Sequence, residues 1–110
     1  MNKDEGILHE LFEVITARKD ANPELSYTAR LYAAGINKIA QKLGEEAVET
    51  IIAAAAEGKA ETISESADLL YCLLVLWAAK GVAPEDVWAE LDKRFGTSGV
   101  AEKETRKKGV

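Results

Sequence analysis

The sequence is poor in the residues that form disulfides and bind transition metals. It contains one cysteine, Cys72, and one histidine, His9, among 110 residues. A single cysteine excludes an internal disulfide framework and a cysteine-rich zinc site. A single histidine excludes a histidine-rich metal cluster. We therefore expect the thiol of Cys72 to be reduced.

The sequence also lacks long apolar runs and an excess of positive charge. Its longest apolar run, residues 69–79, is interrupted by Tyr71 and Cys72 and is shorter than the ~20 residues that span a bilayer. The net charge of −5 argues against general binding to nucleic acid or to an anionic membrane. The first residues include neither an apolar signal region nor a transit segment. These absences predict a cytoplasmic protein with no nucleic-acid or membrane partner.

What remains is the composition of an all-α protein of one domain. Proline occurs only twice and β-branched alternation is scarce, whereas alanine is abundant. Apolar periodicity and glycine positions predict helices over residues 3–19, 27–34, 36–57 and 61–80, and a fifth from Pro84 to Arg94. We expect an all-α domain over residues 1–96 and a basic, mobile tail over residues 97–110.

The fourth predicted helix is apolar on every side in its second half. Its large apolar side chains are Leu69, Leu70, Leu73, Leu74, Val75, Leu76 and Trp77. Such a helix must be covered all round, and a chain of this size buries only part of its surface alone. We therefore expect an antiparallel helical bundle completed by dimerisation.

Five acids gather on the third and fourth predicted helices. Glu45, Glu46 and Glu49 lie within an arc of about 100° on the third, and Glu65 and Asp68 share a face of the fourth. A turn near residue 58 would make the helices antiparallel and bring Glu49 level with Asp68. Apolar residues interleave with these acids, so a solvated surface does not explain them well.

Several carboxylates forced together repel one another and raise each other's pKa. A divalent cation removes that repulsion, and ligands that are all oxygen suit Mg²⁺ or Mn²⁺ rather than Zn²⁺. Lys38 and Lys42 precede the acids on the same side of the third helix, which indicates a ligand with several phosphates. The alternative is a structural acidic face, with Lys42 and Glu46 an ordinary pair one turn apart.

The acids read Glu-Glu-x-x-Glu at 45–49 and Glu-x-x-Asp at 65–68. This pattern resembles that of the all-α nucleoside triphosphate pyrophosphohydrolases, the MazG-like superfamily. Ser26-Tyr27-Thr28 and the tail segment Gly96-Thr97-Ser98-Gly99 resemble, more narrowly, the phosphoribosyl-ATP pyrophosphohydrolase family. The resemblance extends over nearly the whole chain, from about Leu8 to Lys108.

The resemblance implies an ATP-binding enzyme that uses Mg²⁺ to release pyrophosphate from phosphoribosyl-ATP, giving phosphoribosyl-AMP in the second step of histidine biosynthesis. It implies that the metal-binding and catalytic residues are Glu45, Glu46, Glu49, Glu65 and Asp68. The candidates for holding phosphates are Lys38, Lys42, Arg94, Arg106, Lys107 and Lys108. The family usually has histidine where this sequence has Cys72. Whatever that histidine does in the family, we do not expect Cys72 to do it here. We interpret Cys72 as a small buried residue rather than a nucleophile.

Three rival hypotheses stay open on the sequence. A house-cleaning pyrophosphohydrolase of ordinary nucleoside triphosphates would carry the same acids. A non-catalytic helical dimerisation module would need none of them. A di-iron bundle is disfavoured because it uses Glu-x-x-His pairs, and no such pair occurs.

Overall fold

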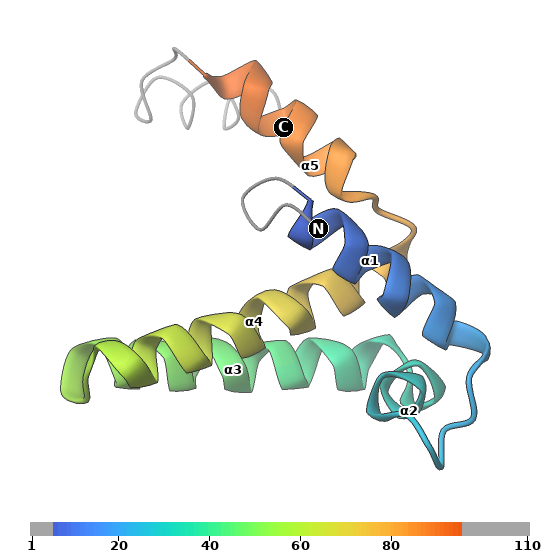
Figure 1. Ribbon diagram of the computed structural model, residues 1–110, viewed down its shortest axis with the longest axis horizontal. Coiled ribbons are helices and arrows are strands. Elements are labelled where there is room, and N and C mark those ends of the chain that lie inside the picture. The colour runs from blue at the N-terminus through green and yellow to red at the C-terminus, as the bar shows by residue number, and fades with distance from the viewer. Residues whose placement is uncertain (1–5, 96–110) are drawn as a thin grey trace.

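The computed structural model describes residues 6–95, and within this range every regular element is helical (Figure 1). The all-α class expected from the sequence is therefore confirmed. The elements are α1 (Ile7–Ala17), the 3₁₀ turn η1 (Arg18–Asp20), α2 (Tyr27–Ala34), α3 (Ile36–Ala56), α4 (Lys59–Lys80) and α5 (Pro84–Arg94). The expected tail, residues 97–110, lies outside the described range.

Gly35, Gly81 and Pro84 bound helices as the sequence indicated, and the cap at Ser26 is an addition from the structure. The Ser26 hydroxyl accepts a hydrogen bond from the Ala29 N–H at 3.2 Å and so caps α2. Gly35, with φ of 96°, separates α2 from α3, and Gly81, with φ of 72°, ends α4. Both are left-handed values that glycine adopts without a steric penalty. Pro84 opens α5, where its missing N–H is not needed.

Helices α3 and α4 form a long antiparallel hairpin and share the most extensive contact between any two elements (Figure 1). Only Glu57 and Gly58 lie between the helix that ends at Ala56 and the one that begins at Lys59. The Thr50 hydroxyl lies 2.7 Å from the Glu46 carbonyl oxygen on its own helix and 3.1 Å from the Glu65 carbonyl oxygen on α4. The Thr50 hydroxyl therefore links α3 to α4 and helps to set the register between the two helices.

The apolar core lies at one end of this hairpin, where α1 and α2 pack against it (Figure 1). The buried cluster consists of Ile15, Leu31, Ile39, Leu74, Val75 and Ala78. The Tyr32 hydroxyl donates to the Ile15 carbonyl at 3.1 Å and ties α2 to α1. The other end of the hairpin projects beyond α1, α2 and α5.

The bounds of α1, α3 and α4 differ from the sequence prediction. Helix α3 was expected over residues 36–57 and ends at Ala56, and α1 begins at Ile7. Helix α1 was expected over residues 3–19, but it ends at Ala17 and continues as one 3₁₀ turn. Tightening of the last turn is a common way to satisfy carbonyl groups at a helix end. Helix α4 begins at Lys59, two residues before the expected start, which shortens the connection and changes which side chains stand opposite one another.

Helix α4 also passes a test of length and composition for a membrane span, with an 18-residue window of mean hydropathy 1.3. The sequence predicted no membrane span because its longest apolar run is too short. The mean hydropathy of a window is a different measure, because it includes the polar residues between the apolar ones. One such helix is weak support for a span, since core helices of water-soluble proteins pass the same test.

Candidate active site

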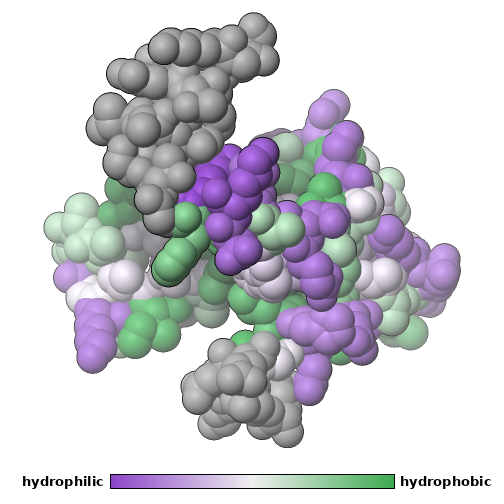
Figure 2. All heavy atoms as spheres, turned by 90° about the horizontal axis from the view of Figure 1, so that it is seen from above, coloured by the Kyte–Doolittle hydropathy of each residue, from purple (hydrophilic) through white to green (hydrophobic). Residues whose placement is uncertain are grey.

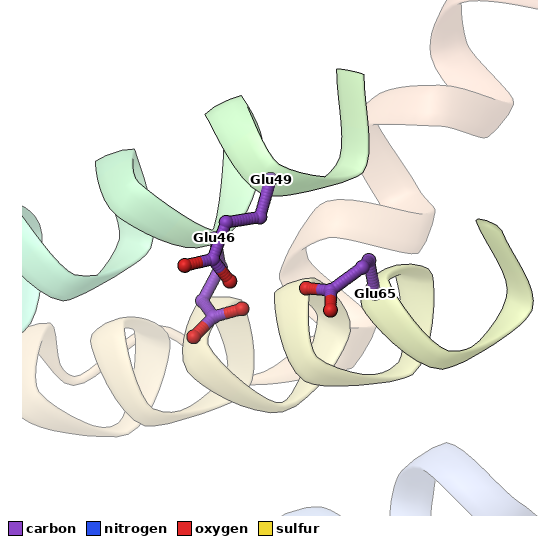
Figure 3. A group of neighbouring side chains, drawn as sticks. All are labelled: Glu46, Glu49 and Glu65. Carbon is purple, nitrogen blue, oxygen red and sulfur yellow. The ribbon is translucent and has the colours of Figure 1, made fainter. Parts of the chain in front are cut away.

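Three carboxylates from two helices converge between α3 and α4. Glu46 and Glu49 lie three residues apart on one face of α3, and Glu65 points toward them from α4 (Figure 3). One carboxylate oxygen from each side chain lies within 4.8 Å of those of the other two. We call Glu46, Glu49 and Glu65 the acid trio.

The most informative member of the trio is Glu46, whose residue is only 6% exposed. Its Oε1 is 3.0 Å from the Lys42 Nζ one turn earlier. Its Oε2 is buried and has no hydrogen-bond partner among the described residues, and the same holds for Oε2 of Glu65. Burying carboxylate oxygens without a partner is costly, so these two atoms indicate a site that suits a cation.

The charges of the trio and of Lys42 perturb one another. Removal from solvent raises the pKa of Glu65, and the neighbouring Glu49 raises it further. The hydrogen bond to Glu46 is the main cause that raises the pKa of Lys42, to about 12. The lysine ammonium therefore stays charged at neutral pH and compensates part of the negative charge.

A cleft of about 450 Å³ opens beside the trio. Its lining residues come from α2, α3 and α4 and are Tyr27, Lys42, Glu46, Asp68, Tyr71 and Cys72. Asp68 therefore faces the cleft beside Glu46 rather than joining the trio. The Thr28 hydroxyl and the Tyr71 hydroxyl hydrogen-bond across one wall, which fixes α2 against α4.

The pairing of the acids differs by a small shift from the sequence prediction. A turn near residue 58 placed Glu49 level with Asp68, whereas Glu49 meets Glu65. The reason is the short Glu57-Gly58 connection, which moves the centre of the hairpin toward residue 57. Asp68 then lies about one helical turn beyond the trio.

Glu45 does not join the other acids. Its Oε2 accepts a hydrogen bond from Gln41 Nε2 at 3.1 Å, and the residue lines a second cavity of about 370 Å³ between α2 and α3. Lys38 lines this second cavity too and is absent from the acidic cleft. Tyr27 and Lys42 border both spaces, so the two cavities are neighbours.

Arg94, another predicted phosphate ligand, does not line the cleft. Arg94 lies on α5, which contacts α1, and its Nε is 2.9 Å from Glu90 Oε2. The other three candidates, Arg106, Lys107 and Lys108, lie outside the described residues.

Several residues that line the cavities were not assigned a role from the sequence, among them Tyr71, Tyr27 and Arg30. Tyr71 follows Asp68 by three residues, so its place on the acidic face of α4 could have been found from helical spacing. Tyr27 belongs to the Ser-Tyr-Thr segment, which was noticed without a role. Arg30 lies on α2, and its guanidinium is 5.8 Å from the centre of the Tyr27 ring. No spacing pattern links α2 to the acids, so only the fold reveals these contacts.

We predict that Cys72 reacts slowly with iodoacetamide in the folded protein. The residue is 5% exposed. Burial raises the pKa of its thiol, and the negative charge of Glu46 raises this pKa further. At pH 7.5, alkylation followed by mass spectrometry should be much slower than in the same protein unfolded in urea. Equal rates in the two states would contradict the buried, weakly acidic thiol.

A second prediction follows from the raised pKa of Glu65. A carboxyl group whose pKa is higher folded than unfolded favours the folded state while protonated, and this stabilisation is lost as the pH rises above the ordinary value of 4.5. Without metal, Glu65→Gln, which mimics the protonated acid, should gain stability relative to the unsubstituted protein as the pH rises. Urea unfolding in EDTA between pH 4 and 7.5 measures this difference. A difference that does not change with pH would contradict the repulsion within the trio.

The fold and the site define an all-α protein with a carboxylate cluster between two antiparallel helices. Residues 8–95 match the family described as Phosphoribosyl-ATP pyrophosphohydrolase. The chain is 60% identical to the phosphoribosyl-ATP pyrophosphatase of Paramagnetospirillum magneticum over 98% of its length and 99% of the relative's. It is 57% identical to that of Azospirillum brasilense, over 93% of its own length and 92% of the relative's.

The chain therefore belongs to the phosphoribosyl-ATP pyrophosphohydrolase family. It is an enzyme, a hydrolase.

Proposed function

We propose that this protein hydrolyses phosphoribosyl-ATP to phosphoribosyl-AMP and pyrophosphate, the second step of histidine biosynthesis, with Mg²⁺ as cofactor. The names of the relatives support the substrate. The observation that carries the chemistry is the pair of buried, unpartnered carboxylate oxygens on Glu46 and Glu65, next to Glu49.

The donor set fits a hard divalent cation. All the ligand atoms that the trio offers are carboxylate oxygens, which Mg²⁺ and Mn²⁺ prefer. Glu46, Glu49 and Glu65 would hold the cation. Of the other two acids expected to bind it, Asp68 lines the neighbouring cleft and Glu45 lines the α2–α3 cavity. When bound, the cation would neutralise charge on the phosphate oxygens and make a bound water more acidic.

The residues around the cleft supply the other parts of the reaction. Water attacks a phosphorus atom and the bond between the α and β phosphates breaks, so that pyrophosphate leaves with the bonding electron pair. Asp68 faces the cleft outside the trio, and we assign it the proton from the attacking water. The Lys42 ammonium, which borders the same cleft, would bind a phosphate oxygen and offset the charge that develops on pyrophosphate. We keep five further cations as proposed ligands for the other phosphates, of which one, Lys38, lines the neighbouring α2–α3 cavity; the others are Arg94, Arg106, Lys107 and Lys108.

We propose that the active form is a homodimer. Large apolar side chains on the projecting end of the hairpin are about half exposed or more, namely Val48, Ile51, Ile52 and Ile63. Apolar side chains also reach the surface over the hairpin in Figure 2. A second copy offers the same face, so a symmetric pair buries both at once.

The proposed setting is that of a soluble cytoplasmic enzyme with a small-molecule substrate. Its net charge of −5 does not favour nucleic acid or anionic membranes as partners. The acids in the first half of α4, Glu65 and Asp68, are also unfavourable inside a bilayer.

Pyrophosphate release tests the proposal. The purified protein should release pyrophosphate from phosphoribosyl-ATP with Mg²⁺ and should stop when EDTA is added. Ordinary nucleoside triphosphates run in parallel should be poor substrates. Preference for those triphosphates would make the protein a house-cleaning enzyme, and no release from any of them with Mg²⁺ or Mn²⁺ would favour a non-catalytic dimerisation module.

A further inference from the structure

The cavity between α2 and α3 has a chemistry that the cleavage step leaves unused. Its lining is largely apolar and includes Leu31, Ala33 and Ala34. Three cationic residues, Arg30, Lys38 and Lys42, and one acid, Glu45, also line it. The side chain of Lys38 makes no hydrogen bond or ion pair with any other residue in the range 6–95. A cation without a partner beside a largely apolar lining suits an anionic group carried on an organic ring.

The position of this cavity relative to the acid trio sets the length of the ligand. Lys38, Lys42 and Glu46 follow one another at four-residue intervals along α3, so they lie on one side of the helix. Eight residues of helix separate Lys38 from Glu46, a rise of about 12 Å. Tyr27 and Lys42 border both cavities, so one ligand can enter both at once.

Phosphoribosyl-ATP has an anionic group at each end, a triphosphate at one and the 5′-phosphate of the added ribose at the other. ATP has only the first. A triphosphate at the acidic cleft would direct the rest of the molecule past Tyr27, a residue that lines both cavities and whose aromatic ring can offer a flat surface to the adenine. The added ribose and its phosphate then reach the second cavity.

We infer that the α2–α3 cavity binds the phosphoribosyl end of the substrate, with Lys38 and Arg30 holding its 5′-phosphate, and that this contact distinguishes phosphoribosyl-ATP from ATP. The inference rests on the proposed function and adds a specificity site to it. It assigns Lys38 to the phosphate remote from cleavage, and not to the triphosphate. Arg30 has a second task, because its Nη1 donates to the Pro23 carbonyl at 3.1 Å and steadies the entrance to α2.

Steady-state kinetics of Lys38→Gln test the inference. The KM for phosphoribosyl-ATP should rise about 10-fold to 100-fold, the equivalent of one charge-assisted hydrogen bond, while kcat stays within about 3-fold. The inhibition constant of ATP, which lacks the phosphoribosyl group, should not change. Lys38→Arg should restore most of the affinity, and Arg30→Gln should shift KM in the same direction.

Lys93→Gln is the matched control, because it removes the same charge from α5, where the residue is exposed and lines neither cavity. Circular dichroism establishes that each variant is folded. If Lys38→Gln weakens ATP as much as phosphoribosyl-ATP, or changes neither, the specificity site is wrong while the proposed function stands. If the unsubstituted protein does not hydrolyse phosphoribosyl-ATP, both are wrong.

Discussion

Glu49→Gln is expected to lower turnover of phosphoribosyl-ATP by about a thousandfold while the protein stays folded. The substitution keeps the volume of the side chain but removes one of three charges that lie within 4.8 Å of one another. Loss of a charged ligand weakens binding of the divalent cation, and with it the stabilisation of charge during cleavage. Pyrophosphate release at saturating Mg²⁺ measures the effect.

The same substitution should not unfold the protein, which separates a functional acid from a structural one. Removing a negative charge from the trio relieves repulsion, so without metal the thermal midpoint should stay the same or rise. Glu10→Gln, at an exposed position of α1, a helix that contributes no residue to the trio or to the cleft, is the matched control and should retain full turnover. A fully active Glu49→Gln protein would remove the trio from the mechanism.

Ile51→Lys is expected to convert the proposed dimer into monomers. Ile51 is 65% exposed on the projecting part of α3, and a charge placed within an apolar contact must lose its hydration there. Truncations and charges at the centre of an interface typically cost 2 kcal/mol or more, about 30-fold or more in the dissociation constant. Sedimentation velocity at micromolar concentration measures the change in mass.

The control for this experiment is Leu25→Lys. Leu25 is 85% exposed but lies in the loop before α2, away from the hairpin, so the dimer should persist. A monomeric unsubstituted protein, or a dimer that tolerates Ile51→Lys, would contradict the proposed interface. Activity of the monomer then reports whether each site is complete within one chain.

Local signals in the sequence predicted the helices well where a residue forces a helix to end. Helix α2 has the predicted bounds because Ser26 caps its start and Gly35 takes a left-handed conformation at its end. Helix α1 has neither signal at its last turn, and its end was predicted less well. The all-α class followed from composition, since no segment has the alternation of a strand.

The candidate site was predicted as a cluster but not in detail. Helical spacing alone puts Glu46 and Glu49 on one face. Which acid of α4 lies opposite them depends on the number of residues in the connection between the helices. Glu45 differs from its neighbour Glu46 by about 100° around the helix, which is enough to send it to a different cavity. The roles of Tyr27 and Arg30 depend on how α2 lies against α3, and no periodicity within one helix encodes that.

The central claim is that Glu46, Glu49 and Glu65 hold a divalent cation. The most direct test is anomalous diffraction at the manganese edge from crystals of the protein grown with Mn²⁺. The account predicts an anomalous peak between these three carboxylates, within coordination distance of the Oε2 atoms of Glu46 and Glu65, and no such peak in Glu65→Gln. A peak elsewhere, or no peak between the three acids at saturating Mn²⁺, would contradict it.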